Sequence, residues 1–140
     1  MLKRNNFFYL LGSLTLIALV MVPMVLAGFN RVVPGIPTTV TDNNQSYSAV
    51  IVAVGDTNAS LCVDSDDGFN PLLMGDLNVT FTDANMTKAN KFDYCADANT
   101  LVEFACGADI SGPFISDLNV YAFTYNCGDQ NKVCSFGKCV

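Results

Sequence analysis

A short acidic segment in the middle of the chain has the residue types and the spacing of a loop that binds calcium. Asp64, Asp66 and Asp67 are followed directly by Gly68, and Asn70 offers a further side-chain oxygen. Oxygens at alternate positions, followed by a glycine that allows a sharp bend, are typical of Ca²⁺-binding loops. The candidate metal ligands are therefore Asp64, Asp66 and Asn70, and Ca²⁺ is the single cofactor that the sequence suggests.

The same segment also fits an interpretation without a metal. A helix–loop–helix calcium site would require a bidentate glutamate where this chain has Gly75, and no helical pattern flanks the loop. Acidic side chains placed just after Cys62 could instead accept hydrogen bonds from neighbouring backbone amides in an ordinary turn. The two interpretations differ in whether the carboxylates bind a cation or the chain itself.

The composition argues against catalysis. The chain has no histidine, which excludes Ser-His-Asp and Cys-His nucleophilic sites. It also lacks a glycine-rich phosphate-binding loop. Pairs of carboxylates for acid–base chemistry could be drawn from the 13 acidic residues, Glu103 among them, but no spacing selects one pair. We expect a protein that is not an enzyme.

The first 27 residues form a hydrophobic leader. Phe7 to Ala27 is an apolar run of 21 residues, preceded by Lys3 and Arg4. A helix of this length spans roughly 31 Å, about the hydrocarbon core of a bilayer. Pro23 near its end and the small residue Ala27 are also typical of a cleaved secretory signal. The leader is either a signal peptide or a single transmembrane helix that anchors the protein in the membrane, and both place the rest outside the cytoplasm.

The part after the leader is strongly acidic. Its five basic and thirteen acidic residues give it a net charge of −8. This charge disfavours nucleic acid as a partner, because phosphate backbones are repelled. About 113 residues are enough for one small domain with a modest core.

Alternating apolar and polar residues predict a mainly β fold. Residues 28–45 contain Pro34 and Pro37, which favour an extended tether or an edge strand. In residues 46–140, period-2 patterns on several short segments indicate an antiparallel β domain. Tyr121, Phe123 and Tyr125 share an inward face, which we interpret as core. The strand segments are Tyr47–Val54, Leu77–Thr82, Val102–Cys106 (with Glu103 on the polar face) and Tyr121–Cys127.

All six cysteines follow the leader, which predicts three disulfides. Cys127, Cys134 and Cys139 lie close together in a stretch that shows little pattern of regular structure. We expect two of these three to bond to earlier cysteines. Without histidine or paired Cys-x-x-Cys spacing, a zinc site is disfavoured. The half-cystines are Cys62, Cys95, Cys106, Cys127, Cys134 and Cys139.

Four Asn-x-Ser/Thr sequons make the chain a candidate glycoprotein. They begin at Asn44, Asn58, Asn78 and Asn85. Asn78 falls on the polar face of an alternating segment, where a glycan would point into solvent.

Several cysteine-flanking segments resemble a small cysteine-rich ectodomain of exported archaeal surface proteins. The resemblance covers residues 62–140, and three features depart from its pattern: Asp67 in place of a glycine, Phe104 in place of a tyrosine, and a longer spacing from Cys127 to Cys134. It implies a disulfide-stapled extracellular module without catalytic residues. The segments are Cys62-x-Asp64-Ser65-Asp66-Asp67-Gly68, Asp93-Tyr94-Cys95, Leu101-x-Glu103-Phe104-x-Cys106 and Gly137-x-Cys139-Val140.

These features predict a small disulfide-rich antiparallel β domain preceded by one N-terminal hydrophobic helix. We expect an extracellular or cell-surface protein, secreted or anchored, that acts as a non-enzymatic interaction or adhesion module with a protein or glycan partner. One alternative is a subunit of a surface filament or envelope layer that self-assembles through residues 28–45. The other is a single-pass accessory subunit of a membrane complex, held through residues 7–27.

Overall fold

The computed structural model describes residues 29, 31–82 and 88–140, without the side chains of 58–60. The expected mainly antiparallel β fold with three disulfides is confirmed. No helix within these residues is long and apolar enough to cross a membrane. The expected leader, residues 1–27, lies outside them. The elements are β1 (Arg31–Asp42), β2 (Gln45–Asp64), β3 (Asp76–Phe81), β4 (Lys88–Phe92), β5 (Tyr94–Cys95), β6 (Thr100–Cys106), β7 (Asn119–Asn126), a 3-10 helix (Cys127–Gln130), β8 (Cys134–Ser135) and β9 (Lys138–Cys139).

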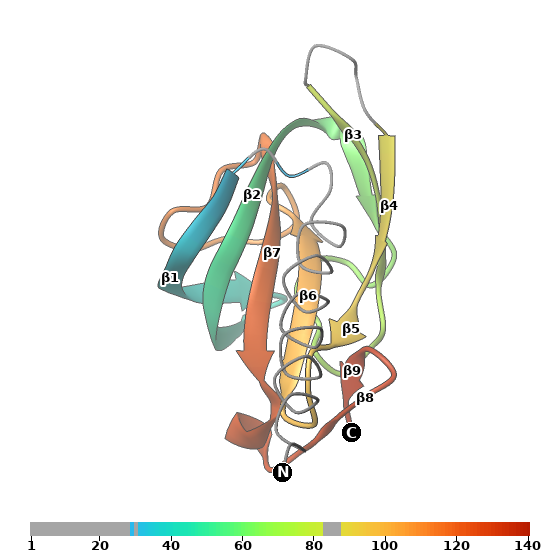
Figure 1. Ribbon diagram of the computed structural model, residues 1–140. Coiled ribbons are helices and arrows are strands. Elements are labelled where there is room, and N and C mark those ends of the chain that lie inside the picture. The colour runs from blue at the N-terminus through green and yellow to red at the C-terminus, as the bar shows by residue number, and fades with distance from the viewer. Residues whose placement is uncertain (1–28, 30, 83–87) are drawn as a thin grey trace, which may run out of the picture.

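Seven of the strands form one antiparallel sheet. Its order is β4-β3-β2-β7-β6-β5, and β1 pairs with β2 outside this path. In Figure 1, β1, β2, β7 and β6 lie side by side, and β3 and β4 lie beyond them on the other side of β6. β8 and β9 form a separate hairpin near the C-terminus.

The long strand β2 connects the two parts of this sheet. Val50 to Asp56 pair with β7, whereas Thr57 to Asp64 pair with β3, and the register with β3 shifts between Thr57 and Cys62. At Gly55, a Cβ atom would lie 2.3 Å from the ring of Phe81. A glycine is therefore required where the aromatic ring packs against the backbone of β2.

Both faces of the sheet centre are covered. One core contains Phe69, Tyr121, Phe123 and Tyr125, and the Phe69 and Phe123 rings meet edge to face with centroids 5.3 Å apart. The inward position expected for the tyrosine and phenylalanine stripe of β7 is therefore confirmed. The second core lies between β3 and the other face of β6 and β7; its buried members are Phe29, Ala53, Leu77, Val79, Phe81, Val102, Phe104, Cys106, Val120 and Ala122.

Three disulfides join segments that are distant in sequence or fold back on themselves. They are Cys62–Cys106, Cys95–Cys134 and Cys127–Cys139. The expectation that two of the last three cysteines bond to earlier ones was wrong, because only Cys134 does so. The reason is the β8–β9 hairpin, which turns the chain back so that Cys139 meets Cys127 after the 3-10 helix. The stretch after Cys127 is thus more regular than its sequence suggested.

The two disulfides of unequal loop length give a first prediction. Cys62–Cys106 closes a separation of 44 residues and Cys127–Cys139 one of 12. In the chain-entropy estimate these loops contribute about 4 and about 3 kcal/mol to the free energy of unfolding. We expect C62A/C106A to lose about 1 kcal/mol more than C127A/C139A in urea unfolding, with the other disulfides verified by peptide mapping. A larger loss from the short loop would contradict the estimate.

Candidate functional site

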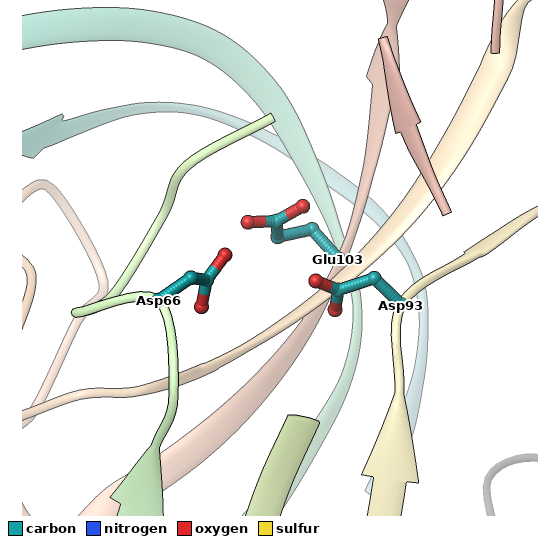
Figure 2. Close-up of side chains that lie close together, drawn as sticks. All are labelled: Asp66, Asp93 and Glu103. Carbon is teal, nitrogen blue, oxygen red and sulfur yellow. The ribbon is translucent and has the colours of Figure 1, made fainter. Parts of the chain in front are cut away.

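Three acidic side chains from three separate segments meet inside the domain. Figure 2 shows the carboxyl groups of Asp66, Asp93 and Glu103 turned toward one another. One oxygen from each lies within 4.8 Å of those of the other two, and all three residues are buried. Asp64 is close enough to act on the pKa values of Glu103 and Asp66. We call Asp64, Asp66, Asp93 and Glu103 the carboxylate cluster.

The turn after β2 places Asp66. Asp67 and Gly68 both have positive φ angles, 67° and 114°, so the chain reverses sharply just after Asp66. Phe69 follows at once and is completely buried in the core. This anchor keeps the turn against the sheet and leaves the Asp66 side chain only 8% exposed.

Asp93 lies between β4 and β5 and is held by backbone amides. Its Oδ1 accepts a hydrogen bond from the Phe104 N–H (2.9 Å) and its Oδ2 one from the Gly75 N–H (2.6 Å). The Asp93 carboxylate thus ties the edge of β6 to the end of the turn. A Cβ atom at Gly75 would lie 2.5 Å from Asp66 Oδ1 and 2.7 Å from Asp93 Oδ2. Gly75 therefore allows the two carboxyl groups to approach the backbone.

Glu103, the only glutamate of the chain, lies in the middle of β6 and has no exposed surface. Its Oε1 accepts a hydrogen bond from the Asn70 N–H at 2.8 Å, whereas its Oε2 is buried without a partner among the described residues. The prediction that Glu103 lies on a polar, exposed face of this strand was wrong. The turn after β2 and the C-terminal segment cover that side of the sheet. A signal was present: Thr100–Cys106 is almost continuously apolar, which is typical of a strand buried on both faces.

An ordinary acidic turn, the alternative to a metal loop, would give Asp64 and Asp66 hydrogen bonds from neighbouring backbone amides. All four of their carboxyl oxygens are buried without a hydrogen bond of ordinary geometry among the described residues, although the backbone amide of Asp66 lies near enough to lower the pKa values of both. The two carboxyl groups approach each other, but a hydrogen bond between them would require a proton on one. These oxygens are therefore shielded from water with little compensation from hydrogen bonds.

The electrostatics of the cluster follow from burial and from like charge. Burial, with the nearby Asp66 carboxyl group, raises the pKa of Asp64 to about 9. Burial also raises the pKa of Asp93 to about 7, although the Phe104 and Gly75 amides oppose the shift. The pKa of Glu103 is raised by burial first and by Asp93 and Asp66 next, and that of Asp66 by burial. The strongest charges acting on the cluster are therefore other carboxylates.

The remaining sequence candidates lie elsewhere or act differently. The Asn70 side-chain oxygen accepts a hydrogen bond from the Leu72 N–H (3.3 Å), so Asn70 serves the cluster through its backbone amide. Of the sequons, Asn44 is exposed in the β1–β2 turn and Asn78 is exposed on β3. The Asn58 side chain and all of Asn85 fall outside the described part of the chain.

A groove with different chemistry crosses β1, β2 and β7. It consists of two adjoining cavities of about 680 Å³ and about 460 Å³, which share Ser48, Tyr125 and Asp129. Phe114 stands at the larger cavity with 72% of its side chain exposed and a positive φ of 69°. The lining consists of Pro37, Thr38, Thr39, Gln45, Ser46, Tyr47, Ser48, Ala49, Val50, Thr100, Pro113, Phe114, Thr124, Tyr125, Asn126, Asp129 and Gln130. None of the carboxylate cluster belongs to it.

Comparisons with known proteins found no match among protein-family profiles, curated sequences or solved structures. The resemblance to a cysteine-rich archaeal ectodomain therefore stays a prediction from the sequence.

The raised pKa values predict how stability depends on pH. The folded protein holds protons on Asp64 and Asp93 up to about pH 9 and about pH 7, whereas the unfolded chain releases them near the ordinary value of 3.8. The folded state binds more protons in this window, so its stability falls as pH rises. In buffer with a chelator, we expect the Tm to decrease steadily from pH 5 to pH 9, as measured by circular dichroism. The D64N variant should show a flatter profile, and a Tm that rises over this range would contradict the assignment.

Proposed function

We propose that this chain is a non-enzymatic interaction module that acts outside the cytoplasm and binds carbohydrate in the groove over β1, β2 and β7. The observation that carries the proposal is the chemistry of this groove, which combines many hydroxyl and amide groups with an exposed aromatic ring. The expected alternatives, a filament subunit and a subunit of a membrane complex, have no feature in the described residues that favours them over this proposal.

The disulfides support a location outside the cytoplasm. All six cysteines are paired, and three disulfides in a domain of this size are consistent with an oxidising environment. Residues Arg31–Asp42 form β1, and most of β1 pairs with β2. In this arrangement the segment that could join a filament is already used within its own chain.

The groove matches a neutral ligand rich in hydroxyl groups. Its lining includes four threonines, two serines, an asparagine and two glutamines, which together both donate and accept hydrogen bonds. Neither lysine nor arginine is among the described lining residues, so the groove lacks the charges that bind phosphate or sulfate. The volume of each cavity, about 680 Å³ and about 460 Å³, lies within the range of about 300–1,000 Å³ that is typical of small-ligand sites.

Phe114 is the residue that we expect to contact the sugar ring. Its backbone is held by neighbours, since the Pro113 carbonyl accepts from Thr38 Oγ1 (2.9 Å) and the Phe114 carbonyl accepts from the Tyr121 hydroxyl (3.2 Å). A positive φ is unfavourable for a phenylalanine, so the surrounding contacts hold a strained residue with its ring in solvent. The face of such an exposed aromatic ring suits the apolar face of a hexose.

The groove gives a testable prediction. We expect the oxidised protein to bind at least one class of neutral oligosaccharide on an array of hexose- and N-acetylhexosamine-terminated glycans. The F114A substitution should weaken this binding by at least about tenfold, equivalent to about 1.4 kcal/mol of lost contact. Titration calorimetry with the best glycan provides the measurement.

Phe136 provides the matched control for Phe114. It is also an exposed phenylalanine with a positive φ, 88% exposed at φ 50°, but it does not line the groove. The F136A variant should bind as the unmodified protein does. Absence of binding to every glycan, or an equal loss in both variants, would contradict the proposal.

A further inference from the structure

We propose that the carboxylate cluster binds one Ca²⁺ ion, which joins the turn after β2 to β6 and to the β4–β5 junction. This inference is independent of the proposed carbohydrate groove. It also changes the ligand set expected from the sequence, because Asp93 and Glu103 replace the side chain of Asn70.

The first support is a set of buried oxygens that are shielded from water with little compensation from hydrogen bonds. Glu103 has no exposed surface, and its Oε2 is buried without a partner among the described residues. Its carboxyl group lies beside those of Asp66 and Asp93 (Figure 2). Both carboxyl oxygens of Asp64 and of Asp66 are also buried without a hydrogen bond of ordinary geometry among the described residues. Buried polar atoms are almost always paired, so several unpaired acceptors in one place indicate a missing positive partner.

The second support is the spacing of these oxygens. One oxygen from each of Asp66, Asp93 and Glu103 lies within 4.8 Å of the others. Two ligands of one Ca²⁺ ion, each at about 2.4 Å, can be at most about 4.8 Å apart. The separations therefore meet the condition that each pair of oxygens must satisfy to share one ion, and Asp64 lies beside Asp66 to add a fourth carboxylate.

The existing hydrogen bonds hold the ligands without using up their oxygens. Asp93 accepts one amide on each oxygen, and Glu103 accepts the Asn70 amide on Oε1 only. Because a carboxylate oxygen has two lone pairs, each of these atoms can still bind a cation. The amides thus fix the orientation of the side chains, as the supporting groups around metal ligands usually do.

The chemistry of the ligands selects the type of ion. The cluster offers only carboxylate oxygens, and all six cysteines are in disulfides, so soft metals lack their preferred ligands. Mg²⁺ is smaller and usually keeps several of its waters, whereas Ca²⁺ accepts six to eight oxygens in a flexible cage of protein groups. A buried cluster of four carboxylates therefore favours Ca²⁺ over Mg²⁺.

The burial of the cluster also defines the role of the ion. Asp66 is 8% exposed, Asp93 4% and Glu103 not at all, so a bound ion would have little access to a substrate. Its effect would be structural, since it would cancel repulsion between segments that are 27 and 10 residues apart along the chain. We therefore expect calcium to change stability and not to create a reactive centre.

The test measures thermal stability and binding on the disulfide-bonded protein. After chelator treatment and dialysis at pH 7.5, addition of 1 mM CaCl₂ should raise the Tm by about 10 °C, as expected for a site saturated about 100-fold above its Kd. Titration calorimetry should give one Ca²⁺ per chain, with 1 mM MgCl₂ producing a much smaller shift in Tm.

Two variants separate a ligand role from a purely structural one. E103Q replaces a ligand oxygen and leaves a side chain that cannot be ionised, so the calcium shift should disappear while the Tm in chelator stays at least as high as that of the unmodified protein. G75A changes no charge, but its Cβ would displace the Asp66 and Asp93 carboxyl groups, so it should weaken calcium binding at least tenfold. D117N, an exposed aspartate outside the cluster, is the matched control and should keep the full shift.

Specific outcomes would overturn the inference. Unmodified protein with no heat of binding and no calcium-dependent Tm shift would show that protons alone neutralise the cluster. A shift that D117N loses as fully as E103Q would assign the effect to general surface charge. Equal shifts with Mg²⁺ and Ca²⁺ would contradict the selectivity and reduce the site to one for any divalent cation.

Discussion

The arrangement of this domain depends on negative charge that is buried where three segments meet. Asp66, Asp93 and Glu103 converge inside the protein, with Asp64 beside them. Each carboxylate that stays ionised in such a place costs several kcal/mol unless a positive partner compensates for it. The chain must therefore hold these segments together against their own repulsion, through backbone amides, protons or the proposed ion. The rest of the fold can be understood as the means by which they are held.

Two of the three disulfides lie at the points where this repulsion would separate the chain. Cys62 precedes Asp64 by two residues, Cys95 follows Asp93 by two, and Cys106 follows Glu103 by three. Each segment of the cluster is thus fixed by a covalent bond close to its acidic residue, and Cys62–Cys106 directly connects two of them. The disulfides are consistent with an oxidising environment. The two kinds of cross-link, the disulfides and the proposed ion, would reinforce each other.

The cluster and the groove divide the domain into a stabilising part and a recognition part. The cluster lies under the turn after β2, on the buried side of β6, whereas the groove crosses β1, β2 and β7 and opens to solvent. The long strand β2 connects the two parts, because it pairs first with β7 and then, as it bends away, with β3 (Figure 1). A sheet supported in this way can hold the backbone of Phe114 in place beside the groove.

The sequence by itself determined the fold class, the participation of all six cysteines in disulfides and the inward face of Tyr121, Phe123 and Tyr125. Period-2 patterns and cysteine content are local properties, which is why these features could be predicted. It also pointed to Asp64 and Asp66 as acidic residues of special interest. Only the tertiary structure brought Asp93 and Glu103 to the same place, since their proximity depends on the bend of β2 and on strand pairing between distant segments. The pairing Cys127–Cys139 was decided in the same way, by a hairpin that the sequence did not reveal. Residues that meet through long-range contacts leave no local pattern in the sequence. The full set of residues in the site could therefore be recognised only in the folded chain.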